Sequence, residues 1–352
     1  MGDYDPTTCA VLDGAVTCLR FPQVRPAKYP TASNVPGTEG TSAITKVIWT
    51  WDVRGHFCGL IGTSVRCWRD AAGATLEPPL ALPPVASMSK PSPAGYACAV
   101  SNDGAIFCWG KFEGKSWQLN PDQGVQQVSG VADAVSVAVD RFSACYIRND
   151  GTVACWGDVH GLGAIGSSAP VTVDGITDAK QITSYQQSWC ALSGDGTTRC
   201  WGRGFFPGRK IVSEDTPVPI ALEPTVALAQ TGTFVTCALG VDKQLRCWGN
   251  GNVPAMRPKR CSTRQRTKNW RVCSKQELGV PRKTVVRNPT RVKGFSNVDS
   301  ISTDGTGLLC AQPASGRVAC WNEPAGDQFH TSDLLSYLPQ VIRGKRGTIR
   351  LQ

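Results

Sequence analysis

The stretch Cys145–Gly157, CYIRNDGTVACWG, decides the fold of this chain. It places one cysteine on each side of the turn-forming triplet Asn149-Asp150-Gly151, and Trp156 comes directly after the second cysteine. Short runs of strand-forming residues around an Asp-Gly turn are typical of a β-hairpin. The stretch therefore predicts two short antiparallel strands whose cysteines face each other.

Variants of this hairpin recur seven times along the 352 residues. Successive first cysteines are separated by 49, 40, 47, 45, 47 and 73 residues. A period in the forties with strand-turn-strand content is typical of a β-propeller blade and not of a helical solenoid. The copies are Cys9–Cys18, Cys58–Trp68, Cys98–Gly110, Cys145–Gly157, Cys190–Gly202, Cys237–Gly249 and Cys310–Trp321.

The turn of each copy is centred between its two cysteines. Cys98 and Cys108 centre on the three-residue loop Asn102-Asp103-Gly104, in which we expect glycine to be left-handed, whereas Asp13-Gly14 and Gly62-Thr63 form shorter two-residue turns. Opposed cysteines in a non-hydrogen-bonded pair lie close enough for a disulfide, so we predict a bridge within each hairpin. Pairing between repeats stays open as the alternative. The predicted bridges are Cys9–Cys18, Cys58–Cys67, Cys98–Cys108, Cys145–Cys155, Cys190–Cys200, Cys237–Cys247 and Cys310–Cys320.

Further strand-like segments precede each hairpin. Examples are Val131–Asp140 and Ile176–Ser184, with Pro- or Gly-marked pieces such as Pro170–Gly175 and Pro289–Gly294 before such segments, so that one unit holds about four strands. The first hairpin lacks this preceding part, and Leu338–Gln352 resembles it. We therefore predict an all-β, seven-bladed β-propeller that forms one domain over residues 1–352. Strands from the N- and C-termini would share one blade and close the ring, which removes exposed sheet edges.

The hairpin, the glycine turn and the Trp-Gly pair resemble the regulator of chromosome condensation repeat family. The third to sixth copies match the blade pattern of that family best, for example at Asp103, Gly104, Trp109 and Gly110. The resemblance implies a seven-bladed propeller that serves as a binding scaffold without a particular ligand. The cysteines that flank each hairpin look like a bacterial exported branch of the family. The Gly-Gln-Leu-Gly segment that usually follows Trp-Gly in the family is nearly absent here.

Cysteine usage and missing motifs restrict the function class. Sixteen cysteines at regular spacing beside only three histidines favour disulfides over zinc sites, and hence a secreted, periplasmic or cell-surface protein. No apolar run is long enough for a transmembrane helix. No nucleophile elbow, phosphate loop, zinc-protease motif or calcium loop is present. We therefore expect a monomeric protein that is not an enzyme and needs no cofactor or metal.

One basic insertion departs from the repeat pattern. It spans residues 250–293, between the sixth and seventh hairpins, and contains Cys261 and Cys273, which could close a small loop. From Met256 to Lys293 there are thirteen Lys or Arg residues and one acid, Glu277, so this part carries +12 and the remainder of the chain −2. We predict a cationic loop that binds an anionic partner, although a solvated excursion between blades is the alternative. The candidate binding residues are Arg257, Lys259, Arg260, Arg264, Arg266, Lys268, Trp270, Arg271 and Lys275.

These features predict an exported binding scaffold for a protein or for an anionic polymer or surface, such as a glycan, lipopolysaccharide or nucleic acid. The first alternative is a protein–protein inhibitor or adhesin that uses loops at one end of the propeller, with Phe112, Phe205 and Phe206 as anchors. The second is a lectin-like or carbohydrate-processing propeller. It would use Trp49 and Trp51, which point to the same side if Ile48–Val53 is one strand.

Overall fold

The structure, a computed structural model, consists of β-strands and turns in the residues it describes. None of these residues form a helix with the length and apolar character needed to span a bilayer. The described residues are 7–12, 15–20, 31–49, 52–69, 76–89, 95–110, 124–140, 142–159, 164–185, 187–205, 211–231, 235–251, 284–292, 297–303, 308–313, 318–322 and 340–342.

The strands form seven antiparallel sheets, five with four strands and two with three. The first four sheets are β1 (Thr7–Leu12), β2 (Ala15–Arg20) and β3 (Thr31–Asn34); β4 (Thr41–Trp49), β5 (Asp52–Ile61) and β6 (Ser64–Arg69); β7 (Val85–Met88), β8 (Tyr96–Ser101), β9 (Ile106–Gly110) and β10 (Gln126–Gln127); and β11 (Ala134–Val139), β12 (Ser143–Arg148), β13 (Val153–Val159) and β14 (Ala164–Thr172). The last three are β15 (Ala179–Tyr185), β16 (Ser188–Ser193), β17 (Thr198–Phe205) and β18 (Ile211–Pro219); β19 (Thr225–Thr231), β20 (Val235–Gly240), β21 (Leu245–Gly251) and β22 (Thr284–Arg291); and β23 (Val298–Thr303), β24 (Leu308–Pro313), β25 (Val318–Asn322) and β26 (Gln340–Ile342).

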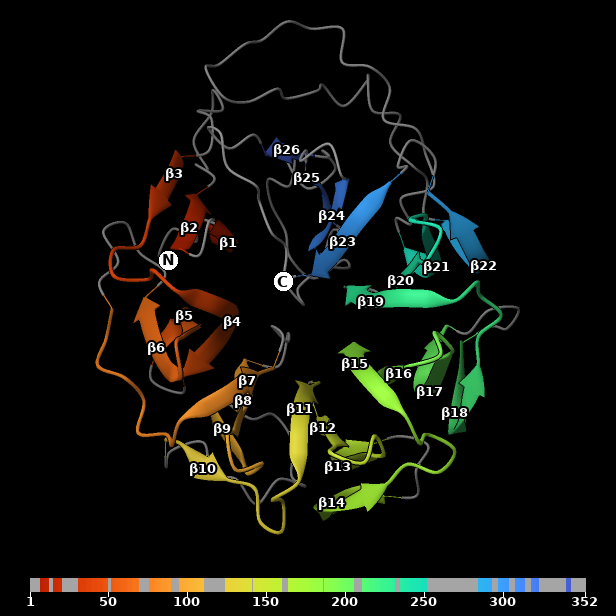
Figure 1. Cartoon of the computed structure of the whole chain (residues 1–352), viewed down its shortest axis with the longest axis horizontal. Coiled ribbons are helices and arrows are strands. Elements are labelled where there is room, and N and C mark those ends of the chain that lie inside the picture. The colour runs from red at the N-terminus through yellow and green to blue at the C-terminus, as the bar shows by residue number, and fades with distance from the viewer. Residues whose placement is uncertain are drawn as a thin grey trace, which may run out of the picture.

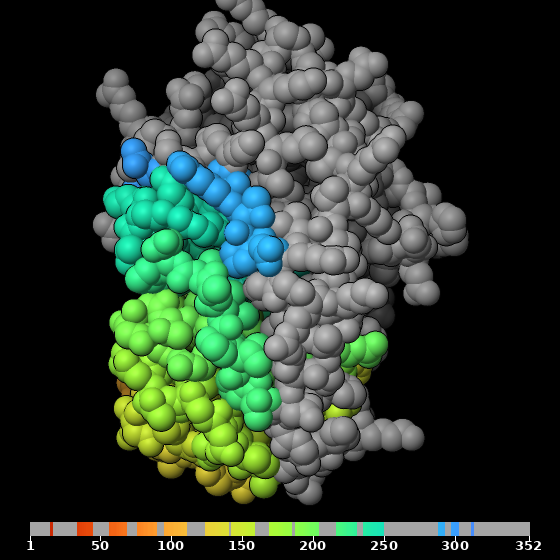
Figure 2. Space-filling model, turned by 90° about the vertical axis from the view of Figure 1, so that its right-hand side faces the viewer, coloured from red at the N-terminus to blue at the C-terminus, as the bar shows by residue number. Residues whose placement is uncertain are grey.

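The sheets stand around a central axis like the blades of a propeller (Figure 1). The first strand of a sheet lies nearest the axis, as with β11 and β15, and the following strands run outward in sequence order. Seen from the side of the fifth and sixth sheets, their described residues stack in sequence order (Figure 2). The predicted all-β propeller class is confirmed.

Two details of strand assignment differ from the sequence expectation. The Pro-marked pieces belong to the outer edge of the preceding sheet, because β14, which includes Pro170, pairs with β13, and β22, which includes Pro289, pairs with β21. In the same way Gln340–Ile342 pairs with Val318–Cys320 and completes the seventh sheet. A proline is compatible with this position because the outer strand leaves one edge unpaired. The expected contribution of the C-terminal strands to the first sheet falls on residues 343–352, outside the described part.

The hairpin turns also join neighbouring sheets. Gly104, Gly151 and Gly196 have φ values of +84°, +82° and +84°, as the turn register predicts. The carbonyl of Gly104 accepts a 3.0 Å hydrogen bond from the N–H of Ala134, which begins the next sheet. Equivalent bonds run from Val85 to Thr63, Ala179 to Gly151, Thr225 to Gly196 and Val298 to Lys243, at 2.8–3.1 Å. Each turn is therefore a joint between two sheets.

Cysteines and tryptophans alternate between the packed sheets. The hairpins from the second to the sixth contain the disulfides Cys58–Cys67, Cys98–Cys108, Cys145–Cys155, Cys190–Cys200 and Cys237–Cys247. Adjacent residues of a strand point to opposite sides of the sheet, so each Cys-Trp pair presents the cysteine to the next sheet and the tryptophan to the preceding one. Thus Trp109, Trp156, Trp201 and Trp248 each share a buried cluster with the disulfide of the sheet before.

The two remaining hairpins keep the same register, with Cys9 opposite Cys18 and Cys310 opposite Cys320. The side chains of these four residues, and all of Cys261 and Cys273, lie outside the described part.

Candidate binding face

The antiparallel order gives the ring two different ends. We call one end the turn face; it carries the hairpin turns, such as Asn102–Gly104, and the connections between sheets, such as 129–133. We call the opposite end the arm face; it carries the connections between first and second strands and those between third and fourth strands. Strands β9, β13, β17 and β21 all end on the arm face. Connections of this kind commonly form binding surfaces on a rigid scaffold.

The glycine of each Trp-Gly pair shapes the arm face. Gly110, Gly157, Gly202 and Gly249 have positive φ, between +85° and +129°. A Cβ on Gly110 would lie 2.7 Å from the carbonyl oxygen of Gly95, so only glycine fits there. The register also shifts at Gly157, Gly202 and Gly249. The third strand bends there and continues as an arm beyond the core.

In the fourth and fifth sheets the arm is tied to the inner connection of its own sheet. The N–H of Asp158 donates to the carbonyl of Phe142, and the N–H of Arg203 donates to the carbonyl of Gln187, both at 2.8 Å. In the fourth, fifth and sixth sheets the arms continue to the pairs Val159–Ala164, Phe205–Ile211 and Gly251–Thr284. The arm connections between these pairs are therefore presented from paired strands.

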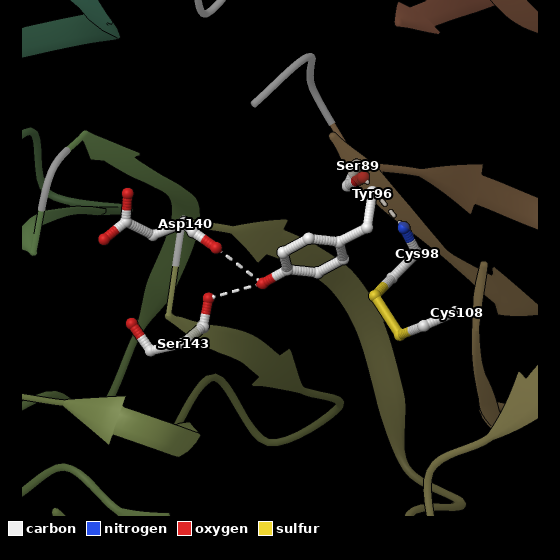
Figure 3. Close-up of a disulfide and its surroundings, with 6 residues drawn as sticks. All are labelled: Ser89, Tyr96, Cys98, Cys108, Asp140 and Ser143. Carbon is white, nitrogen blue, oxygen red and sulfur yellow. Dashed lines mark hydrogen bonds between the residues drawn. A yellow bond between two sulfur atoms is a disulfide. The ribbon is translucent and has the colours of Figure 1, made fainter. Parts of the chain in front are cut away.

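A buried polar network holds the inner part of the arm face between the third and fourth sheets (Figure 3). The hydroxyl of Tyr96 lies 2.6 Å from the carbonyl oxygen of Asp140 and 2.9 Å from that of Ser143, and donates its proton to this pair. Ser89 bonds the N–H of Cys98 at 3.1 Å, next to the Cys98–Cys108 disulfide. Tyr96 is fully buried, and burial, with the nearby Asp140 carboxylate second, raises the pKa of its hydroxyl well above the usual value. Tyr96 therefore acts as a permanent donor.

The same network reaches the fifth sheet. The Asp140 carboxylate is fully buried and accepts a 2.5 Å hydrogen bond from the N–H of Gln187. Gln187 has a φ of +69°, a conformation that side-chain-bearing residues rarely adopt. Its strained backbone is thus fixed on one side by Asp140 and on the other by Arg203. Three consecutive sheets are locked together at the arm face.

The basic insertion leaves the ring at the arm face. Of the predicted span 250–293, Asn250 and Gly251 end β21 and Thr284–Arg291 form β22. The residues between the two strands are 252–283, and the paired residues Gly251 and Thr284 flank them. In the fourth and fifth sheets the same connection comprises only residues 160–163 and 206–210. The strands β21 and β22 contain three arginines and no acid, so they do not neutralise the charge of the insertion.

The predicted binding residues are only partly covered by the structure. Phe205 is the last residue of β17, opposite Ile211, which places its backbone at the tip of an arm. Phe112, Phe206 and the basic residues from Arg257 to Lys275, with Trp270, lie outside the described residues. The contacts of these side chains remain predictions.

The expected Trp49–Trp51 strand is wrong. Trp49 ends β4 and pairs with Asp52, which begins β5, so Ile48–Val53 does not form one strand. Trp51 lies outside the described residues. The segment Ile48–Val53 reads as one strand because no Gly, Pro or Asn marks the reversal. Both strands are long, so the strand-forming sequence continues to Trp49 and resumes at Asp52.

Sequence reasoning missed the network of Tyr96, Asp140, Ser143 and Gln187. The available signal was Asp140, an acid directly after the apolar strand Ala134–Val139. Among the described residues there is no group of three or more His, Cys, Asp or Glu side chains that could hold a metal ion. In the described residues, the arm face consists of the extended ends of the third and fourth strands and the inner connections bonded to them.

Known structures with the same architecture were found, although scans of protein-family models and of curated protein sequences gave no match. Prp20p from Saccharomyces cerevisiae, described with its binding to Gsp1p and histones, aligns with a TM-score of 0.62 and 15% identity over 90% of this chain and 80% of that one. The fold is that of an RCC1-like propeller. Yeast RCC1 (Prp20) with Kap60 bound gives a TM-score of 0.61 and 13% identity over 92% and 85% of the two chains. Human WBSCR16 gives a TM-score of 0.61 and 15% identity over 85% of this chain and 80% of that one.

The expectation drawn from the repeat resemblance is thereby confirmed at the level of fold. The bacterial, exported and cysteine-rich branch of that family stays a prediction.

Proposed function

We propose that this chain is a non-enzymatic binding scaffold of an oxidising compartment, whose basic insertion contacts an anionic macromolecule or surface from the arm face. One observation carries the proposal: residues 252–283 lie between the paired residues Gly251 and Thr284, on strands without an acid. Buried disulfides in five successive hairpins support the compartment.

The charge distribution supports an anionic partner. The segment from Met256 to Lys293 carries +12 and the remaining chain −2, and ten of its thirteen bases precede Thr284, so attraction of an anion is concentrated in residues 252–283. The sixth sheet takes its fourth strand, Thr284–Arg291, from the end of that segment, so residues 252–283 connect two strands that pair with each other. A partner such as a glycan, lipopolysaccharide or nucleic acid would lose affinity steeply as the salt concentration rises, because the release of its counterions on binding becomes less favourable.

The test replaces Arg260, Arg264, Arg266 and Arg271 by Ser and measures binding to heparin and to duplex DNA across a salt series. We expect earlier elution from heparin, and on DNA a salt slope smaller by about one for each phosphate contact removed. The double variant Lys180→Ser/Lys243→Ser is the control, because both lysines lie on the turn face. Equal retention of the insertion variant and the unmodified protein would refute the proposal.

A second candidate is a protein–protein inhibitor or adhesin at the same face. The position of Phe205 at an arm tip favours it. In this case binding would be insensitive to salt and would be lost when Phe112, Phe205 and Phe206 are replaced by Ser. Likeness in fold to Prp20, which is seen with Kap60 bound, is consistent with such use.

A further inference from the structure

The turn face, opposite the arm face, is built from one pattern repeated in six sheets. Each inner strand begins with a bulge, a register shift that leaves its second residue outside the ladder. All six bulged residues are exposed to solvent, whereas the residue before each is buried. They are Ser42, Ala86, Val135, Lys180, Val226 and Asp299.

Three exposed valines lie at this end, Val135 on the fourth sheet and Val226 and Val241 on the sixth. Val135, Val226 and Val241 are 50%, 54% and 59% exposed, and of the residues described only Val171 adds a fourth large exposed hydrophobic, at 37%. Val226 and Val241 belong to one patch of the sixth sheet, since the N–H of Val241 donates to the carbonyl of Pro224 at 2.9 Å. Pro224 is itself exposed. Single exposed apolar residues are ordinary, but a shared patch on one face suggests an interaction site.

The charges around the valines are mostly neutralised in pairs. Lys180 bonds Asp178 at 2.6 Å and Lys243 bonds Asp299 at 2.9 Å. Lys180 and Asp299 are the charged residues among the six bulge positions, and each is neutralised by its partner. The bulge positions with valine are therefore bordered by neutral ion pairs. Arg148–Asp133 and Arg246–Asp242 add two further ion pairs on the same face.

Acids remain in excess after this pairing. In the described turns, connections and strand ends of this face there are ten acids against seven bases. The acids are Glu39, Asp103, Asp133, Asp150, Asp174, Asp178, Asp195, Glu223, Asp242 and Asp299; the bases are Arg66, Arg148, Lys180, Arg199, Lys243, Arg246 and Arg291. Hydrogen bonds from Ser101 and Thr152 hold the pKa of Asp103 and Asp150 below the usual value. The face thus keeps its negative charge at all ordinary pH values.

The backbone beneath the patch is fixed in place. Each turn carbonyl holds the next inner strand, and the inner strands hold one another: the amide of Gln181 both donates to the carbonyl of Leu228, at 2.8 Å, and accepts from its N–H, at 2.9 Å. Ser87 likewise lies 3.2 Å from the carbonyl oxygen of Val135. A partner would therefore meet a preformed surface and lose little entropy in ordering it.

We infer that the turn face is a second docking surface, for a polypeptide segment of a partner protein that carries apolar side chains beside Lys or Arg. Val226, Val241 and Val135 supply the apolar contact, and acids such as Glu223 and Asp174 complement the cations. The excess of acid disfavours nucleic acids and acidic glycans here. The two ends of the ring would then select partners of opposite charge.

The test selects random peptides displayed on phage against the intact protein, and then measures the binding of an enriched synthetic peptide. We expect enriched peptides to combine Lys or Arg with Leu, Ile or Phe. Replacing Val226 and Val241 by Ser should weaken the Kd about tenfold, and Glu223→Gln with Asp174→Asn about threefold with a smaller salt dependence. Val171→Ser, on the outer strand β14, is the matched control and should leave the Kd unchanged.

Three results would overturn the inference. They are the absence of any enriched peptide, enrichment of acidic peptides, and equal affinity of all four proteins for the selected peptide. Sedimentation of the unmodified protein and of Val226→Ser/Val241→Ser adds a fourth: self-association that this variant abolishes would assign the patch to a second copy of the chain. Heparin retention of the variants should stay unchanged, which separates this site from the proposed function of the insertion.

Discussion

The joint between sheets predicts a specific cost for the substitution Gly104→Ala. With φ at +84°, an alanine there costs about 1–2 kcal/mol in backbone strain alone. Its Cβ would lie 2.6 Å from the carbonyl oxygen and 2.9 Å from the carbonyl carbon of Ala132, so the connection to the next sheet must move. That movement weakens the 3.0 Å bond from Ala134 to Gly104, worth about 1 kcal/mol. We expect a loss of about 3 kcal/mol in the free energy of unfolding.

Gly130→Ala is the matched control, because Gly130 is also left-handed, with φ at +76°, but has no atom within 4 Å of the position of a Cβ. It should lose only the strain term, about 1–2 kcal/mol. Urea unfolding followed by tryptophan fluorescence measures both variants, and the midpoint of Gly104→Ala should be the lower at equal slope. Equal midpoints would show that the turn closes its own hairpin without acting as a joint between sheets.

Three further perturbations follow from the same contacts. Tyr96→Phe should destabilise by about 1–2 kcal/mol in urea unfolding, because the buried carbonyls of Asp140 and Ser143 lose the hydroxyl donor, although that of Ser143 still accepts from the N–H of Asp140; an unchanged midpoint would contradict the network. Cys145→Ser with Cys155→Ser should lower stability by about 2–4 kcal/mol, and dithiothreitol should then have a smaller effect on the thermal midpoint than in the unmodified protein. The turn acids Asp103, Asp150, Asp195 and Asp242 have lowered pKa values in the folded chain, so their stabilisation is complete above the unfolded pKa of about 4 and is lost as the pH falls through the folded values. Asp150→Asn with Asp195→Asn should flatten the loss of stability measured between pH 5 and pH 2, and an unaltered profile would contradict this account.

The local part of the fold could be predicted from the sequence, and the contacts between repeats could not. Cys98 and Cys108 are ten residues apart in one hairpin, and a turn centred between them places them opposite each other. Tyr96 and Asp140 are 44 residues apart, and Asp140 and Gln187 are 47 apart, about one repeat in each case. Tyr96 and Gln187 have no residue of the same type at the matching positions of the other copies, so the repeat pattern does not mark these side chains as partners.

The assignment of outer strands failed for a related reason. Pro170–Gly175 precedes one hairpin in sequence but completes the sheet of the hairpin before it. A strand pattern shows that a segment pairs, but it does not show with which neighbour. The location of the candidate site depended on assigning each outer strand to its sheet. Because Gly251 pairs with Thr284, the inserted residues follow a complete third strand.

The difference between the two faces also explains where this ring can accept an insertion. On the turn face, a lengthened turn in the sixth hairpin would displace the carbonyl of Lys243 and with it the first residue of the seventh sheet, Val298. On the arm face, the third and fourth strands pair up to Gly251 and Thr284 before the inserted residues begin, so their length does not disturb the ladder. A long insertion is therefore expected on the arm face, whereas the hairpin turns of the turn face can differ only slightly in length. The turn face can acquire binding specificity only through exposed side chains, such as Val226 and Val241, on a backbone of fixed shape.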